Sequence, residues 1–298
     1  MKNLLKLSTF TSLGFKFSVP KSKWYPKKLD LNSKYFIVTG ANSGLGFETA
    51  KVLLQMNANV IIICRSQKRM NEAESEFKKL KKGRVYPLCY DLSDLNSLTP
   101  LTRDILAITH RIDCLIHNAG ALLKEKTTTP QGFETSFALM TLMPFKLTLA
   151  LKNQLKKIVW VSSGGMYGAP HNLIDLHYKQ RPYDGVMAYA ENKRHQVDLA
   201  KSFADKYPHL KSYSMHPGWV DTPGVQRSLP LFRKLVRPFL RNYYQGCDTI
   251  IYLSVESLDE GNGEFWFDRK IVAKSFFDKG PATSFEDREK LWELLSQY

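Results

Sequence analysis

Seven short apolar segments recur along the chain and alternate with longer segments of helical pattern. Hydrophobic residues run continuously through the short segments, which is typical of strands buried on both faces of a parallel sheet. The longer segments carry Ala, Leu, Lys, Glu and Gln at helical spacing. We predict strands over residues 35–40, 59–64, 84–92, 113–120, 157–163, 210–218 and 263–268, and helices over 44–56, 67–82, 94–110, 131–152, 185–206 and 245–257.

This alternation predicts a doubly wound α/β fold, with a mostly parallel seven-stranded sheet flanked by helices in a single domain. We divide the chain into a basic N-terminal extension (1–34), a main domain (35–282) that includes a lid segment (223–245), and a C-terminal helix (283–298). Ligands of open α/β sheets bind beyond the carboxyl ends of the strands, so we expect the functional site at that edge.

The formal net charge is +15, and residues 1–34 contribute +7 of it. The remaining basic residues are mixed with acidic ones and form no stripe with interleaved aromatics, which argues against a nucleic-acid partner. A small ligand rich in phosphate fits this distribution better. No segment reaches the roughly 18 uncharged apolar residues that a membrane span requires.

The four cysteines, Cys64, Cys89, Cys114 and Cys247, show no CxxC spacing. Three of them lie inside apolar segments, where a small residue packs well. We therefore predict reduced core thiols in a reducing compartment, and no metal site.

The first 28 residues contain no acid and mix Lys with Leu, Phe, Ser and Thr. Three interpretations stay open: a helix packed on the outside of the domain, a mitochondrial or other targeting peptide, and a segment that contacts a membrane surface. The absence of arginine disfavours targeting. We favour the packed helix and a cytoplasmic protein, with membrane association left open.

A glycine-rich stretch, 39-TGANSGLG-46, directly follows a predicted strand and opens a predicted helix. Gly40 permits a tight turn, Gly44 lets the backbone approach a pyrophosphate, and Gly46 lets the helix pack close to the sheet. This pattern predicts a site for the phosphates of a dinucleotide. Farther along, Tyr189 and Lys193 are four residues apart on a predicted helix and therefore share one face.

Six motifs, TGxxxGxG, DL, NAG, VSS, YxxxK and PGxVxT, follow in this order over residues 35–222. Together they resemble the short-chain dehydrogenase/reductase superfamily. The segments SSGGM (162–166) and FWFDRK (265–270) resemble one branch of it. The resemblance implies a Rossmann-like sheet, a nicotinamide cofactor, and oxidoreduction of a small carbonyl or alcohol substrate.

The resemblance also assigns roles to residues. Tyr189 corresponds to the general acid, with a pKa that the positive charge of Lys193 lowers, and Ser163, rather than its neighbour Ser162, to the partner of the substrate oxygen. The implied catalytic residues are Ser163, Tyr189 and Lys193. The implied cofactor-binding residues are Gly40, Asn42, Ser43, Gly44, Leu45, Gly46, Arg65, Asp91, Leu92, Asn118, Ala119, Gly120, Tyr189, Lys193, Pro217, Gly218, Val220 and Thr222.

Charge after the second predicted strand bears on the choice of cofactor. NAD enzymes place an acid there for the ribose 2′-hydroxyl, whereas this chain reads IIICRSQKR. Arg65 stands at that point, and a guanidinium suits a 2′-phosphate. We therefore expect NADP(H).

The chain departs from the family pattern after NAG. Met140 stands where relatives carry an asparagine that takes part in proton relay, and a thioether donates no hydrogen bond. Nearby, Met143 replaces a usual glycine and Pro144 disturbs a helix interior. Two hypotheses follow: an enzyme of reduced activity with a water-only relay, or an NADP(H)-binding protein with a regulatory or scaffold role.

The segment after PGxVxT is amphipathic. Its apolar side predicts either a domain helix with a solvated basic face or a lid over a lipophilic carbonyl substrate, as in lipid metabolism, with its arginines near a membrane. Pro238 is expected to kink this helix. Ser284 and Asp287 predict a capping box at the start of the C-terminal helix.

Overall fold

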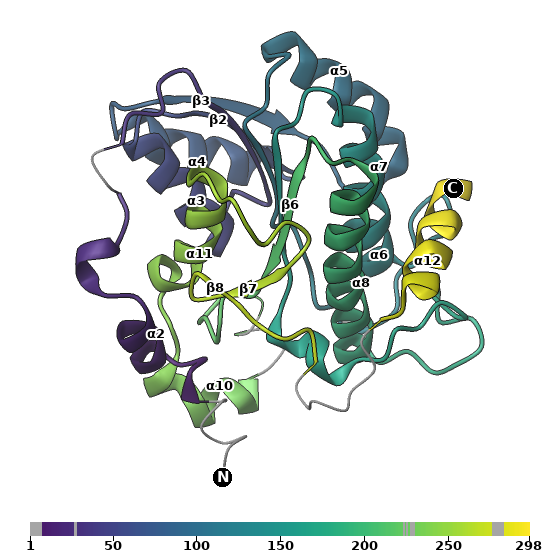
Figure 1. The fold of residues 1–298 in the computed structure, drawn as a ribbon. Helices are drawn as coiled ribbons and strands as arrows, with labels where there is room; N and C mark the ends of the chain where they lie inside the picture. Colours follow the sequence, from purple (N-terminus) through teal and green to yellow (C-terminus); the bar gives the residue numbers. More distant parts are fainter. Residues whose placement is uncertain (1–7, 27–28, 223, 225, 227–229, 276–282) are drawn as a thin grey trace.

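A computed structural model describes residues 8–26, 29–222, 224, 226, 230–275 and 283–298. Its centre is one eight-stranded sheet in the order β3-β2-β1-β4-β5-β6-β7-β8 (Figure 1). The first seven strands pair in parallel, which confirms the doubly wound α/β prediction. The strands are β1 Tyr35–Thr39, β2 Asn59–Cys64, β3 Arg84–Cys89, β4 Cys114–His117, β5 Lys157–Val161, β6 Lys211–Met215, β7 Phe265–Phe267 and β8 Lys270–Ile271.

The eighth strand is the one difference from the predicted sheet. β8 has two residues and pairs antiparallel with β7 across a turn in which Asp268 and Arg269 have φ of 47° and 62°. Two residues are too short to produce a hydrophobic pattern, and neither turn position is a glycine, so the sequence contained no hairpin signal.

Helices cover both faces of the sheet, with α3, α4 and α11 on one side and α5, α7 and α8 on the other (Figure 1). Along β2, Val60 and Ile62 belong to the first core, whereas Ile61 and Ile63 belong to the second. This division explains the continuous apolar run of that strand. The helices are α2 Ser12–Ser18, α3 Gly44–Gln55, α4 Gln67–Lys78, α5 Leu98–Ile108, α6 Thr135–Phe137, α7 Met143–Leu151, α8 Gly185–Lys206, α10 Pro230–Val236, α11 Tyr243–Val255 and α12 Phe285–Gln297.

Short 3₁₀ segments stand beside these helices: η1 Lys21–Lys23, η2 Leu95–Ser97, η4 Gly164–Gly168 and η5 Arg237–Phe239. The last directly follows α10, so the predicted amphipathic helix changes form at Pro238, as expected. Part of the lid prediction falls on residues 223, 225 and 227–229, outside the described residues.

The helix predicted over 131–152 is interrupted. Glu134 caps its start at α6 by accepting from the N–H groups of Ser136 and Phe137. A π-helical segment, η3 Ala138–Leu142, then separates α6 from α7. Pro144 stands just after this segment, inside the first turn of α7, where its missing N–H breaks the regular i to i−4 pattern.

The first and last described helices, α2 and α12, both bury apolar side chains: Phe15 on α2, and Leu291 and Leu295 on α12. Thr11 caps α2, and Phe15 on that helix is fully buried, in agreement with the packed-helix interpretation of the N-terminus. At the other end Ser284 and Asp287 form the predicted capping box of α12.

Two expectations need correction or comment. Cys89 is exposed and not a core thiol, because it ends β3 at the edge of the sheet; Cys64, Cys114 and Cys247 are buried, and all four are free. Within the described ranges, no helix is both long enough and apolar enough to cross a membrane.

Candidate active site

The glycine-rich turn between β1 and α3 lies at the carboxyl edge of the sheet. Gly40 and Gly44 have φ of 67° and 58°, in the left-handed region that glycine adopts without steric cost. Gly46 leaves no room for a side chain, because a Cβ there would lie 2.4 Å from Asn118 Nδ2 and 2.5 Å from the Gly40 carbonyl oxygen. The backbone of α3 therefore starts directly against the turn.

The start of α3 is open to an anion. Ser43 is its N-cap, yet its exposed side chain makes no capping hydrogen bond in the part of the chain that the structure describes. The N–H groups of the first turn have no partners inside the helix, and the helix dipole makes this end positive. The turn fits the phosphates of a dinucleotide.

The NAG turn after β4 lies between the glycine turn and Lys193. Asn118 Nδ2 donates to the Thr39 carbonyl oxygen at 2.8 Å, and the backbone N–H groups of Asn118 and Ala119 both donate to Thr39 Oγ1 at 2.9 Å. Gly120 is exposed, and a Cβ on it would lie 3.4 Å from Lys193 Nζ. A bound cofactor could therefore run along this turn from one end of the site to the other.

Arg65, Asp91 and Leu92 stand at the ends of β2 and β3. Arg65 is exposed and directly follows the last residue of β2. Asp91 accepts from the N–H and the hydroxyl of Ser93 at 2.9 and 2.7 Å, and Leu92 is buried in the core. A guanidinium with a solvated approach thus stands where the sequence predicts the adenosine ribose.

The loop after β6 reaches back to the glycine turn. A Cβ on Gly246 of α11 would lie 2.6 Å from a methyl carbon of Leu45 and 2.6 Å from one of Val220. Leu45 and Val220 therefore meet over this glycine, and Thr222 follows with its N–H bonded to the Val220 carbonyl. The two loops form one continuous edge.

Arg241 contacts the same loop at Pro217 and Gly218. This role of Arg241 was not predicted from the sequence. Its guanidinium is 1% exposed and forms a two-point ion pair with Asp268, with N···O distances of 2.6 and 2.9 Å. It also donates to the carbonyl of Pro217 at 3.4 Å and crowds Gly218, whose φ is 77°. Further donations go to the carbonyl oxygens of Thr9, Phe10 and Thr11.

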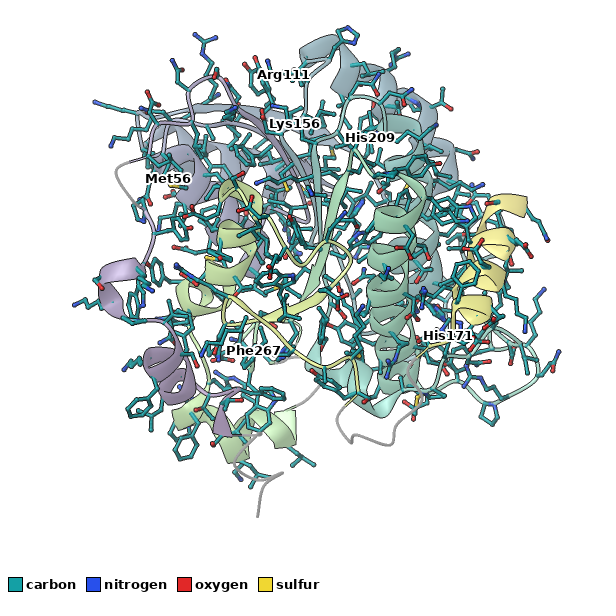
Figure 2. The ribbon with its side chains drawn as sticks, viewed as in Figure 1. Met56, Arg111, Lys156, His171, His209 and Phe267 are labelled. Carbon is teal, nitrogen blue, oxygen red and sulfur yellow. The ribbon has the colours of Figure 1, made fainter. Side chains whose placement is uncertain are left out.

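An aromatic cluster fills the space beside this arginine. The His216 ring stacks on Phe267 with centroids 4.1 Å apart, and Phe10 meets both rings edge-on at 4.7 and 5.2 Å; Phe267 is labelled in Figure 2. The N–H of Trp219 donates to the Phe10 carbonyl at 2.9 Å. The predicted nicotinamide loop therefore rests on the N-terminal segment.

The two serines after β5 point in opposite directions. Ser162 is buried and donates its hydroxyl to the Lys193 carbonyl on α8 at 2.6 Å. Ser163 caps η4 by accepting from the Gly165 N–H at 3.1 Å, and it hydrogen-bonds the phenol of Tyr189. The structure thus brings Ser163, and not Ser162, together with Tyr189.

Lys193 lies at the centre of the site, one turn of α8 from Tyr189. Its amine is buried, donates to the Val161 carbonyl at 2.7 Å and to Gln196 Oε1 at 3.1 Å, and lies 5.4 Å from the centre of the Tyr189 ring. Burial lowers the pKa of Lys193 to about 7, because a charged amine is poorly solvated there.

The pKa of Tyr189 moves opposite to the sequence-based expectation. Burial raises it above the usual value of a phenol, and the hydrogen bond with Ser163 only partly opposes this. The physical reason is that the same burial that surrounds the phenol also removes charge from Lys193. Tyr189 therefore keeps its proton at neutral pH in this structure.

Met140 occupies the middle of the π-helical segment beside the lysine. Its side chain is buried, and its sulfur would lie 3.2 Å from a Cβ placed on Gly120. Its carbonyl accepts from Gln196 Nε2 at 2.7 Å. Gln196 is a site residue that sequence reasoning missed, although its position three residues after Lys193 places it on the same helix face.

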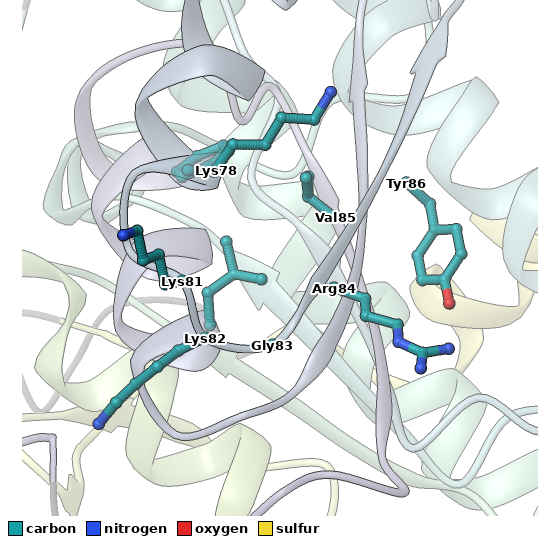
Figure 3. Close-up of a pocket in the computed structure, with 9 residues that line it drawn as sticks. Lys78, Lys81, Lys82, Gly83, Arg84, Val85 and Tyr86 are labelled. Atoms are coloured by element: carbon teal, nitrogen blue, oxygen red, sulfur yellow. The ribbon is translucent and has the colours of Figure 1, made fainter.

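A hollow of about 430 Å³ lies elsewhere, between the end of α4 and the start of β3 (Figure 3). Its rim carries four exposed basic residues, but it stands at the amino end of the strand and beside the negative end of the α4 dipole. It is therefore poorly placed for chemistry at the carboxyl edge. Its lining residues are Leu54, Phe77, Lys78, Lys81, Lys82, Gly83, Arg84, Val85 and Tyr86.

Residues 34–230 match the family model described as short chain dehydrogenase. The chain belongs to the short-chain dehydrogenase family. Members are oxidoreductases with a nicotinamide cofactor, and the open start of α3 and the close-packed glycine turn fit such a cofactor.

Two curated relatives span nearly the same length. The chain is 33% identical to human dehydrogenase/reductase SDR family member 12, over 98% of this chain and 94% of that protein. The late motifs SSGGM and FWFDRK were expected to indicate this branch, and the match confirms it. The chain is also 30% identical to bovine retinol dehydrogenase 12, over 89% of this chain and 86% of that protein.

Solved structures show the same fold. An uncharacterized protein from Mycobacterium paratuberculosis aligns with a TM-score of 0.73 and 25% identity, over 91% of this chain and 95% of that one. A short-chain dehydrogenase from Escherichia coli CFT073, solved in complex with NADPH, aligns with a TM-score of 0.65 and 22% identity, over 82% and 100%.

Proposed function

We propose that the protein is an NADP(H)-dependent oxidoreductase that acts on a lipophilic carbonyl or alcohol, with Ser163, Tyr189 and Lys193 as its catalytic residues. The observation that carries this proposal is the convergence of the three residues at the carboxyl edge, beside the NAG turn that leads to the open start of α3. The remaining cofactor contacts proposed are those of the glycine turn, the NAG turn and the loop 217–222.

When bound, the nicotinamide ring supplies or accepts the hydride. The protein supplies position and the proton. Tyr189 holds a proton on its phenol oxygen at neutral pH, because burial raises its pKa, and can donate it to a carbonyl oxygen. Ser163 is hydrogen-bonded to the same phenol and can share the substrate oxygen with it. Lys193, charged when it gains a proton, stabilises the phenolate that remains.

We infer NADP(H) rather than NAD(H) from Arg65. The residue is exposed at the end of β2, and the sequence carries no acid between it and Glu72. A guanidinium there favours a 2′-phosphate through charge and paired N–H donors, and offers little to a 2′-hydroxyl.

The lipophilic substrate is inferred from the lid and one relative. Leu231, Leu235 and Phe239, on α10 and η5, are 77%, 79% and 56% exposed, so apolar side chains stand free beyond the loop 217–222. The bovine relative is named for retinol, a lipophilic alcohol.

The same apolar side chains support peripheral contact with a membrane. Leu13 and Phe17 on α2 are also exposed, and Arg241, two residues after η5, donates to the carbonyl of Thr11, the N-cap of α2. Exposed Lys16, Lys234 and Arg237 add positive charge, so an anionic bilayer is the surface this region fits. Pelleting with phosphatidylserine vesicles tests this, with Leu235→Glu expected to reduce the bound fraction; equal pelleting of both proteins would refute it.

The main experiment measures NADPH consumption by the purified full-length protein against all-trans-retinal, a steroid ketone, a fatty aldehyde and a quinone. We expect turnover with at least one lipophilic carbonyl, and little with NADH in place of NADPH. NADPH binding without turnover on any of the four would support the second hypothesis, a catalytically impaired cofactor-binding protein, which Met140 beside Lys193 motivates.

A further inference from the structure

The amine of Lys193 is held by two acceptors from different parts of the chain. Val161 at the end of β5 offers its backbone carbonyl at 2.7 Å, and Gln196 on α8 offers its amide oxygen at 3.1 Å. A neutral amine has two N–H groups and an ammonium has three. The two acceptors therefore engage both N–H groups of the neutral form and leave one position on the nitrogen.

Gln196 is itself held at its other end. Its side chain is fully buried, and its Nε2 donates to the carbonyl of Met140 at 2.7 Å. A buried primary amide that lost this contact would leave a polar group unsatisfied, which is costly. The contact therefore determines where Gln196 Oε1 points.

The carbonyl of Met140 is available because of Pro144. In a regular helix this carbonyl would accept from the N–H four residues later, but residue 144 is a proline and has none. The chain opens into a π-helical segment at this point. The side-chain amide of Gln196 donates a hydrogen bond to the Met140 carbonyl, to which Pro144 cannot donate.

We propose that Gln196 is a positioning residue of the candidate active site: its amide bridges the amine of Lys193 to the carbonyl of Met140 and thereby fixes the direction of the remaining position on that nitrogen. The inference rests on the proposed role of Lys193. Gln196 touches neither the substrate nor the reacting phenol in this scheme, and it acts through the lysine alone.

A second consequence concerns proton movement. The thioether of Met140 donates no hydrogen bond, and the amide of Gln196 is neither an acid nor a base at neutral pH. Neither side chain can therefore pass a proton to or from Lys193 by itself.

Asn192 provides a matched control for the structural role of such an amide. It is also buried on α8, it accepts from Thr141 Oγ1 in the same π-helical segment, and it donates to the Ala188 carbonyl at 2.8 Å. It makes no hydrogen bond to Lys193 among the described contacts. Asn192→Leu therefore loosens the same segment without removing an acceptor from the amine.

The test follows the titration of Lys193 in the free protein by NMR of lysine labelled with ¹³C at the ε position, with the signal assigned by its loss in Lys193→Arg. Burial sets the wild-type pKa at about 7. We expect Gln196→Met to lower it by about one unit, because the ammonium loses an acceptor, and Gln196→Glu to raise it by about one unit or more. Asn192→Leu should leave it unchanged.

Equal shifts in Gln196→Met and Asn192→Leu, or no shift in either substitution of Gln196, would overturn the proposal. Gln196→Glu preserves the shape of the side chain, so the comparison of Gln196→Glu with Asn192→Leu decides the matter if Gln196→Met does not fold. The titration needs neither cofactor nor substrate. Failure of the wild-type protein to oxidise NADPH would therefore remove the proposed function and leave this result standing.

Discussion

The two ends of the candidate site are built in different ways. At the glycine end, Gly40, Gly44 and Gly46 make room by lacking side-chain atoms, and the contacts that close the turn come from neighbouring backbone. At the lysine end, the buried amine of Lys193 donates to partners on β5 and α8, and the half-buried Tyr189 lies beside Ser163, the N-cap of η4. The glycine end depends on the absence of side chains, so added volume should impair it. The lysine end depends on hydrogen bonds, so removal of a polar group should impair it.

The largest effect is expected at the lysine end. Tyr189→Phe removes the proton donor and should lower kcat/KM for carbonyl reduction about 10²- to 10⁴-fold, the usual contribution of a general acid. NADPH affinity, measured by fluorescence titration, should change little because the glycine end is intact. Tyr183→Phe, which removes a phenol six residues earlier on a contact to Glu134, serves as the control and should keep activity. Full activity in Tyr189→Phe would contradict the assignment.

The next effect is expected at the glycine end. Gly46→Ala places a methyl group 2.4 Å from Asn118 Nδ2 and 2.5 Å from the Gly40 carbonyl oxygen, so the backbone must shift. We expect an overpacking cost of about 1–3 kcal/mol in stability and roughly 10- to 100-fold weaker NADPH binding. Gly168→Ala meets nothing within 4 Å and should match the wild type in both. Equal behaviour of the two variants would show that the turn tolerates extra volume.

The pH dependence of kcat/KM tests the protonation state of Lys193. Lys193 has a pKa of about 7, whereas the buried rings of His117 and His216 have pKa values of about 3 and stay neutral. Protonated Lys193 favours transfer of the Tyr189 proton, so kcat/KM for reduction should be constant below pH 7 and fall about tenfold per unit above it. A profile that is flat from pH 6 to 8 would exclude titration of Lys193 as its cause.

The titration of Lys193 also makes the stability of the folded protein depend on pH. The pKa of Lys193 is lowered on folding, from 10.5 to about 7, so the unfolded chain binds the proton more tightly. The cost of burying Lys193 is fully present below pH 7 and disappears as the pH rises toward 10.5. Lys193→Met should therefore stabilise the protein more at pH 6 than at pH 10, measured by urea unfolding. An equal gain at both values would show that folding does not shift the pKa of Lys193, so that the amine stays protonated in the folded chain.

The smallest effect is expected from Arg65→Ser at the glycine end. The side chain is exposed, so its attraction to a 2′-phosphate is weakened by solvent, and we expect NADPH affinity to fall about five- to tenfold. NADH affinity should stay the same, because it has no phosphate at this position. Lys68→Ser, one turn further along, removes an equal charge and serves as the control. An equal loss for NADPH and NADH would place Arg65 elsewhere in the site.

The comparison also explains what could be predicted from the sequence. The strands and the glycine turn follow from local patterns: apolar runs for strands buried on both faces, and glycines where backbone must approach backbone. Even α8 was predicted with its observed bounds, because Asp184 caps it and no proline interrupts it. The choice of Ser163 over Ser162 came from the family resemblance, and the structure directs Ser162 toward α8.

Long-range contacts could not be predicted in this way. Gln196 bonds a carbonyl 56 residues away, and the residue four positions after that carbonyl is a proline, which has no N–H to donate to it. Arg241 looked like one more basic residue of an amphipathic segment, yet it pairs with Asp268 inside the protein. The raised pKa of Tyr189 likewise depends on burial, which motif spacing does not report.

The hydrogen bonds from Arg241 to the carbonyl oxygens of residues 9–11 have a practical consequence. A shorter protein that began at the first strand would lack these carbonyls. The guanidinium of Arg241 would then lose three hydrogen-bond acceptors, and the loop 217–222 would lose the residues that it packs against. Residues 9–11 therefore help to hold the loop 217–222 in place, and a shortened version that keeps this support must begin ahead of Thr9.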